Sequence, residues 1–189
     1  VRVAACYHKD PTMMNYIHDS STDMHRDMAK ELFMIKDVPK DVRTHVKGGF
    51  VFAEFYGDYY RQVCQNLWEA VGRFGLTTAD GTGLYDHLAA KGIPKLGPCL
   101  SGVKPAPGTF EAHVKKVEDG FWQDRFPVYA QWKEDWFKSY VRDGGFHTLT
   151  GFTLAGQFSR NEVINYAVQG SAFHCLLWSL SRLTKQMKE

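Results

Sequence analysis

The segment from Arg43 to Gly57 constrains this chain most, because its spacing predicts one helix with a chemically distinct face. Arg43 and Lys47 are four residues apart, so they share one side of a helix. The aromatic residues Phe52 and Tyr56 follow at helical spacing, and Gly57 can end the helix. Fixed cations beside stacking rings form a site for an anionic ligand that also carries a flat base. A nucleoside triphosphate fits that description better than other common metabolites.

Composition sets wide limits on the fold and on its partners. A chain of 189 residues suits one domain or a large part of one, and 44% hydrophobic residues are enough to bury a core. The net charge of +2 neither demands nor excludes nucleic acid. No apolar run approaches the roughly 20 residues of a membrane span, so we expect no membrane association.

The four cysteines are widely scattered and form no CxxC pair: Cys6, Cys64, Cys99 and Cys175. This spacing favours neither a zinc site nor a disulfide framework. It is more typical of a protein in a reducing compartment, so we expect a cytoplasmic location, which is the host cytoplasm if a phage encodes the chain.

The pattern of apolar residues, prolines and glycines predicts a mainly α fold with one small β hairpin. Residues 75–108 are rich in glycine and proline and are interpreted as a surface insertion with a short helix. The hairpin is expected to turn at Thr150-Gly151. Helices are expected over about 1–7, 11–18, 23–34, 39–56, 58–73, 83–91 and 110–142, with a break at Pro127, and from Ser159 onward.

Four motifs in order resemble family A DNA polymerases, the group of bacterial DNA polymerase I and many phage replicative enzymes. The family's fingers motif reads Arg-x3-Lys-x3-Phe/Tyr-x3-Tyr-Gly. The matching segments here are Asp23-Met-His25 with Ala29, Arg43 to Gly57, Gly145 to Gly151, and Asn165 to Ala172 with Gln169-Gly170-Ser171. The resemblance spans nearly the whole chain, and the insert-like middle, around residues 77–125, is more typical of the phage branch than of a bacterial repair enzyme.

The resemblance implies an internal fragment of a right-hand polymerase, with fingers and part of the palm. Residues 1–35 would lead from palm to fingers, 36–142 would form the fingers with the insertion, and 143–189 would return to the palm. The family's two metal-binding aspartate motifs would lie outside this chain. Two Mg²⁺ ions are therefore expected in the full-length enzyme, with no metal ligand among these residues.

The resemblance also implies roles in nucleotide binding. Arg43 and Lys47 would grip the triphosphate, and Lys47 would also protonate the leaving pyrophosphate, so these two are the predicted catalytic residues. His25 would donate a hydrogen bond to the triphosphate. Phe52 would lie against the incoming sugar and base, and Tyr56 near the templating base. Taken alone, the two cations would more often be a solvated helix face.

One register stays open in the fingers motif. The family has three residues between the lysine and the aromatic residue, whereas this chain has four if the residue is Phe52 and two if it is Phe50. Counting back from Tyr56-Gly57 favours Phe52, and the helix angle from Lys47 favours Phe50. Gly48-Gly49 could absorb one extra residue as a bulge, and Phe52 is preferred.

A second group of residues is expected to contact primer–template DNA. Amides such as Asn165 and Gln169 can both donate and accept hydrogen bonds. Minor-groove acceptors lie in similar places for all base pairs, so such amides can test pair shape without reading sequence. The resemblance places both near the new pair, with Arg160 near phosphate or template and Gly57 beside the DNA. Their alternative role is helix capping and internal hydrogen bonding.

Three functions compete. The preferred one is template-directed DNA synthesis from dNTPs on a primer–template by a monomeric enzyme, to which this fragment would contribute contacts without being active alone. A single-subunit RNA polymerase shares the lysine and Tyr-Gly features. A non-catalytic helical module that binds nucleic acid is the alternative from another class, and the presence of the two aspartate motifs in the parent would separate it from an enzyme.

Overall fold

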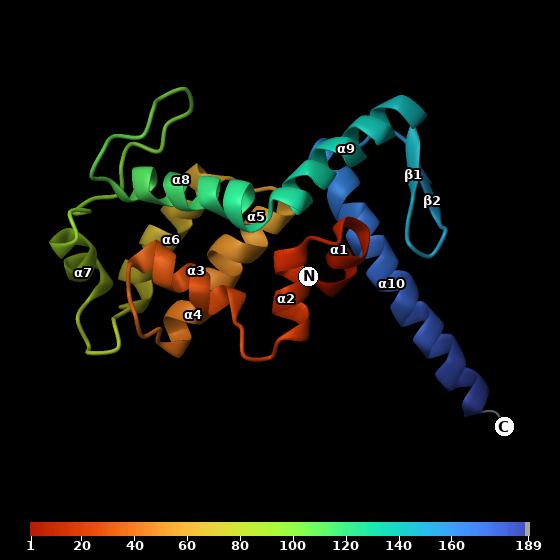
Figure 1. Ribbon diagram of the computed structural model, residues 1–189, viewed down its shortest axis with the longest axis horizontal. Helices are drawn as coiled ribbons and strands as arrows, with labels where there is room; N and C mark the ends of the chain where they lie inside the picture. Colours follow the sequence, from red (N-terminus) through yellow and green to blue (C-terminus); the bar gives the residue numbers. More distant parts are fainter. Residues whose placement is uncertain (188–189) are drawn as a thin grey trace. The chain divides into compact units, whose positions relative to one another are not determined.

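The computed structural model describes residues 1–187 and divides into two compact units (Figure 1). The central unit is Asp19–Arg125, and the terminal unit combines Val1–His18 with the chain from Phe126 onward. Helices dominate both units, and the terminal unit also holds a two-stranded antiparallel hairpin. The predicted class, mainly α with a small β hairpin, is confirmed. The predicted polymerase segments, 1–35, 36–142 and 143–189, divide the chain at other points and stay predictions.

The central unit forms helices where the sequence supplies their ends. Asp23 caps the first of them, because its Oδ1 accepts a hydrogen bond from the Arg26 N–H at 3.1 Å. Pro39 precedes the next helix, and Gly75 in a left-handed conformation ends the longest. The elements are α3 (Met24–Phe33), α4 (Lys40–Val46), η1 (Lys47–Phe52), α5 (Ala53–Tyr56), α6 (Tyr60–Phe74), α7 (Leu84–Ala90), α8 (Phe110–Gly120) and η2 (Phe121–Arg125).

The element η1 is a π-helix, and it confirms the predicted bulge at Gly48-Gly49. A π-helix accommodates one extra residue per turn, so Lys47 and Phe52 come to one face although five positions separate them. Gly49 permits this path, because a Cβ there would lie 3.0 Å from Leu67 Cδ2 on α6. Gly57, with φ of 96°, ends α5 as predicted.

The core of the central unit joins α3, α4, η1, α6, α7 and α8. Phe50 is fully buried, and its ring meets Phe121 edge to face with centroids 5.3 Å apart. Phe55 also packs against Phe121. Phe50 is therefore a core residue, and Phe55 is half-buried beside the same ring. Other fully buried members are Met28, Leu32, Phe33, Val42, Val46, Val63, Leu84, Leu88, Phe110 and Val114.

Two acidic side chains support the helix that carries the aromatic residues. Glu54 of α5 is buried and accepts a hydrogen bond from the Trp122 indole at 2.9 Å. Glu118 of α8 accepts one from the Tyr60 N–H at 2.8 Å, at the start of α6. Burial raises the pKa of Glu118 above its ordinary value. The protonated form is therefore the one that this packing favours.

In the terminal unit, one carboxylate caps two helices. Asp10 is fully buried, and its Oδ1 accepts the Thr12 and Met13 N–H groups at the start of α2 (Pro11–His18). Its Oδ2 accepts the Val128 and Tyr129 N–H groups at the start of α9 (Pro127–Asp143). A negative charge stabilises the N-terminus of each helix, so Asp10 joins α2 to α9.

His8, the last residue of α1 (Arg2–His8), is held as a neutral ring. Its Nδ1 accepts a hydrogen bond from the Asp10 N–H at 2.9 Å, and its ring stacks on Tyr129 with centroids 4.1 Å apart. Burial lowers the pKa of His8 to about 4. Protonation would place a hydrogen on Nδ1 and break the bond from Asp10.

The hairpin and the last helix complete the terminal unit. Strands β1 (Gly145–His147) and β2 (Thr153–Ala155) pair antiparallel, with Phe146 opposite Leu154 and Gly151 in the turn, as predicted. Phe146 belongs to a core with Tyr140, Val163 and Ala167. Trp136 and Phe137 pack against that core, and Trp132 stacks on Trp136. Trp122 packs against Phe55 in the central unit.

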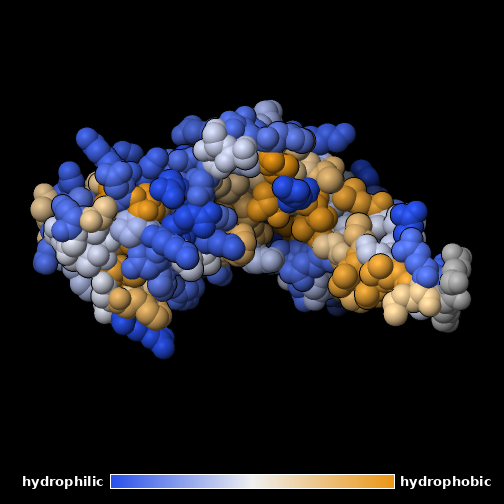
Figure 2. Space-filling model, turned by 90° about the horizontal axis from the view of Figure 1, so that it is seen from below, coloured by the Kyte–Doolittle hydropathy of each residue, from blue (hydrophilic) through white to orange (hydrophobic). Residues whose placement is uncertain are grey.

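Helix α10 (Arg160–Gln186) begins with a capping box between Ser159 and Glu162, which confirms its predicted start. Beyond Ser171, its apolar side chains lie exposed, and Figure 2 shows hydrophobic residues gathered over this end of the chain. The exposed residues are Phe173, Leu176, Leu177, Trp178, Leu180 and Leu183. Within residues 1–187, neither α10 nor another helix has the length and hydrophobicity of a membrane span.

Candidate functional site

Phe52 is the centre of a cluster that contains most of the predicted nucleotide-binding residues. Lys47 Nζ lies 5.3 Å from the centroid of the Phe52 ring. The His25 ring meets Phe52 edge to face with centroids 5.7 Å apart, and the Tyr56 ring lies at 6.5 Å. Tyr56 is 54% exposed and Phe52 is half-buried, so ring surface stays open to solvent. Three separate elements, α3, η1 and α5, supply these side chains.

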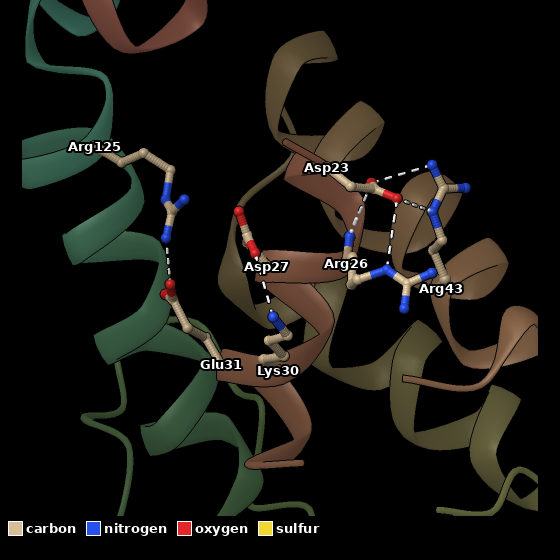
Figure 3. A network of polar contacts seen from close by, with 7 residues as sticks. All are labelled: Asp23, Arg26, Asp27, Lys30, Glu31, Arg43 and Arg125. Atoms are coloured by element: carbon tan, nitrogen blue, oxygen red, sulfur yellow. Dashed lines mark hydrogen bonds and ion pairs between the residues drawn. The ribbon is translucent and has the colours of Figure 1, made fainter. Parts of the chain in front are cut away.

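Arg43 is fixed by Asp23 (Figure 3). Its Nε donates to Asp23 Oδ2 at 2.6 Å, and its Nη2 donates to Oδ1 at 3.1 Å. This two-bond geometry holds the planar guanidinium in one orientation. Figure 3 shows the third guanidinium nitrogen pointing away from Asp23. Asp23 thus occupies one edge of the Arg43 guanidinium and leaves the other edge available to an anion.

Asp23 is the residue of this site whose pairing with Arg43 the sequence did not reveal. It serves as the N-cap of α3 and as the partner of Arg43, and Arg26 Nε lies 3.9 Å from its Oδ2. The neighbouring cations and hydrogen bonds outweigh its partial burial and lower its pKa. The Asp-x-His spacing marked Asp23 as a motif residue, but the twenty positions between Asp23 and Arg43 gave no signal of the pair.

His25 is surrounded by the same charges. Burial is the largest cause of its lowered pKa, and the positive charges of Arg43 and Lys47 lower the pKa further. The negative charge of Asp23 raises it, but by less. The imidazole is therefore neutral near pH 7, with one N–H donor and one acceptor. Its buried Nδ1 has no hydrogen-bond partner among residues 1–187. Arg43 and Lys47 therefore lie near enough to His25 to influence its pKa.

Ion pairs on the rest of α3 lie apart from this cluster. Lys30 pairs with Asp27 at 3.7 Å, and Glu31 pairs with Arg125 of η2 (Figure 3). These pairs join neighbouring turns of α3 or tie α3 to η2. Lys30 is consequently a useful comparison for Arg43 and Lys47, because it is an exposed cation of the same unit that contacts none of the aromatic cluster.

The predicted DNA-contacting residues of α10 lie in the terminal unit. Gln169 is exposed, and Asn165 is half-buried with a partner of its own. They are one helical turn apart and therefore share a side of α10. Arg160 forms an exposed ion pair with Glu134 of α9, so its guanidinium has a partner within the protein. Gly57 is exposed at the end of α5, in the central unit.

A hydrogen-bonded network joins two of the predicted motifs, the segment from Gly145 to Gly151 and the segment from Asn165 to Ala172. The Tyr7 hydroxyl donates to the Ala167 carbonyl at 2.9 Å and lies 2.7 Å from Ser171 Oγ. The Leu149 N–H donates to Tyr7 Oη and to Ser171 Oγ, both at 3.0 Å. The small hydroxyl of Ser171 thus ties α10 to the turn before it. Tyr7 was missed by the sequence analysis, because its partners lie more than 140 positions away.

Among residues 1–187, no three His, Cys, Asp or Glu side chains are grouped so that they could hold a metal ion. The resemblance implies two Mg²⁺ ions whose ligands would lie in motifs outside this chain. Those ions remain a prediction about residues outside this chain.

Comparisons with known proteins support the fold. Neither protein families nor curated proteins gave a match to the sequence. Among solved structures, the chain is similar to the POL domain of Pol1 from M. smegmatis, which was solved in complex with a DNA primer-template and dNTP. The TM-score is 0.55 at 15% identity, over 90% of this chain and 25% of that chain. The chain thus spans about a quarter of that structure's length and has a polymerase-like fold.

Proposed function

We propose that this chain is the fingers and adjoining palm segment of a family A DNA polymerase of the phage branch. One observation carries the proposal: His25, Arg43 and Lys47 converge with Phe52 and Tyr56 on one site of a polymerase-like fold. Cations and stacking rings together match a nucleotide that carries a triphosphate. The parent protein would transfer a nucleotide from a dNTP to a primer 3′ end.

Arg43 and Lys47 would bind the triphosphate with different geometries. Arg43, held through one edge by Asp23, presents its other edge to phosphate oxygens without first losing rotamer freedom. Lys47 is exposed at the end of a flexible four-carbon side chain, so its ammonium can follow charge that develops on the leaving pyrophosphate and donate a proton to it. Asp23 therefore acts as a positioning residue for Arg43.

His25 and the rings would complete the nucleotide site. A neutral imidazole donates one hydrogen bond to a phosphate oxygen and adds no charge to an already cationic site. Phe52, between His25 and Lys47, offers its half-buried ring to the sugar and base, and exposed Tyr56 offers a stacking surface near the template. The full burial of Phe50 against Phe121 supports Phe52, rather than Phe50, in this role.

Contacts with the primer–template would come from other residues. Gln169 is free to reach solvent, and Asn165 lies one turn before it on the same side of α10. Arg160 would have to exchange Glu134 for a phosphate, a step that its exposed position permits. Gly57, without a side chain, would let DNA approach the end of α5 closely. The isolated chain is expected to be inactive, because the metal-binding aspartates of such a polymerase would lie outside it.

The proposal is tested by binding of dNTP to the chain and to variants matched in charge. Arg43→Ala and Lys47→Ala should each weaken dNTP binding at least tenfold, because each removes a phosphate-binding cation. Lys30→Ala removes the same charge from α3 and should leave affinity within twofold. A dNMP should bind much more weakly than the dNTP. Equal losses in all three variants would show nonspecific attraction and overturn the proposed triphosphate site.

A further inference from the structure

Two thiols that are distant in the sequence lie in contact within the central unit. Cys64 Sγ on α6 is 3.3 Å from Cys99 Sγ, which belongs to the segment between α7 and α8. Cys64 is fully buried, whereas Cys99 is partly exposed. The thiols Cys6 and Cys175 are exposed and belong to the terminal unit.

The backbone around Cys99 holds its thiol in place. The Cys99 N–H donates to Glu111 Oε2 at 2.9 Å, and Glu111 is fully buried on α8. Gly97, with φ of +116°, passes so close that a Cβ there would lie 2.8 Å from Glu111 Cβ. The Phe110 N–H donates to the Lys95 carbonyl at 2.9 Å. The contact between the sulfurs is therefore fixed from both sides of Cys99.

We propose that Cys64 and Cys99 form a dithiol site that closes to a disulfide when a small-molecule disulfide, such as glutathione disulfide, reaches Cys99. A disulfide has its sulfurs about 2.05 Å apart, so the two Sγ atoms must approach by about 1.3 Å, which side-chain rotation can supply. This inference goes beyond the proposed nucleotide site and does not depend on it.

The exchange proceeds in two steps that balance. The Cys99 thiolate attacks one sulfur of glutathione disulfide, forms a mixed disulfide and releases one glutathione. The buried Cys64 thiolate then attacks the Cys99 sulfur and releases the second glutathione. The protein loses two electrons and two thiol protons, and both appear in the two glutathione thiols. Cys64 is thus the resolving residue, because small molecules cannot reach it first.

The environment of the pair makes the reaction slow near neutral pH. Burial raises the pKa of both thiols, and for Cys64 the shift is large. The reactive thiolate is therefore scarce, and closure should speed up as pH rises from about 7 to 9. Once closed, the disulfide would link α6 to the segment before α8, and so restrict the insertion that the sequence left without a role.

Mass spectrometry tests the site in a chain with Cys6→Ser and Cys175→Ser, which leaves only the two thiols. Glutathione disulfide should yield a product lighter by two hydrogen atoms, with a Cys64–Cys99 peptide after digestion. Adding Cys64→Ser should instead leave a stable glutathione adduct on Cys99. Adding Cys99→Ser should leave Cys64 unmodified. The oxidised protein should melt about 5 °C or more above the reduced one.

Two results would overturn the proposal. One is a stable glutathione adduct on Cys99 while Cys64 stays a free thiol in the same molecule. The other is no closure of the pair after prolonged incubation at about pH 9, where its thiolates are more abundant, under conditions that fully modify Cys6 and Cys175 in the unaltered chain. Binding of dNTP to the wild-type chain is measured in parallel. Failure of the disulfide proposal can then be distinguished from failure of the nucleotide-binding proposal.

Discussion

Phe50 and Phe52 offer a matched pair of substitutions, because two rings two positions apart have opposite surroundings. Phe50 is fully buried against Phe121, whereas Phe52 is half-buried between His25 and Lys47. Phe50→Ala should lower the free energy of unfolding by about 3–5 kcal/mol, as for a buried phenylalanine. Phe52→Ala should lower it by less, about 1–2 kcal/mol, because part of its ring is exposed to solvent.

Leucine variants keep both proteins folded for the binding assay. Phe52→Leu removes the ring on which a base would stack, a contact worth about 1–3 kcal/mol, so dNTP affinity should fall at least fivefold. Phe50→Leu should cost about 1–2 kcal/mol of stability and leave dNTP affinity within twofold. Urea unfolding and fluorescence titration measure the two quantities. Unchanged dNTP affinity in Phe52→Leu, or an equal loss in Phe50→Leu, would refute the assigned register.

Three further predictions concern stability. Asp10→Ala removes the shared cap of α2 and α9 and should cost about 2–4 kcal/mol in thermal unfolding; a loss under 1 kcal/mol would contradict the double cap. The pKa of His8 in the folded protein is about 4, below its ordinary value of 6.5. The free energy of unfolding should therefore fall by at most about 3 kcal/mol as pH drops from 6.5 to 4. His8→Asn should reduce this dependence of stability on pH. Burial raises the pKa of Glu118, so the free energy of unfolding should fall as pH rises above 4.5. Glu118→Gln keeps the contact with Tyr60 and should be more stable than the wild type at about pH 8. A less stable Glu118→Gln variant at that pH would contradict the burial argument.

Local signals predicted most of the helices. Asp23 and Ser159 are N-caps, Pro127 starts α9, and Gly57 and Gly144 end helices in left-handed conformations. Each of these signals acts within a few residues, so the chain's own order reveals it. The bulge at Gly48-Gly49 was also predictable, because two glycines weaken an α-helix at the position where one extra residue had to be placed.

Contacts between distant residues were not predictable in the same way. The Asp23–Arg43 pair depends on how α3 packs beside α4, and the contact of Cys64 with Cys99 depends on how the insertion folds back on α6. The Phe50–Phe121 contact identifies Phe50 as a core residue only once α8 and η2 are in place. The partner of Arg160 also comes from another helix, α9. A single sequence does not show which distant residues come into contact in the fold.

Mapping dNTP binding on the chain by NMR tests the central claim most directly. Titration with dNTP and with inorganic triphosphate should shift the amide signals of residues 43–57 and the ring signals of His25, with the base adding shifts at Phe52 and Tyr56. These shifts should vanish in the Arg43→Ala/Lys47→Ala chain. Shifts confined to other parts of the protein, or none at millimolar nucleotide, would contradict a triphosphate site at Arg43 and Lys47.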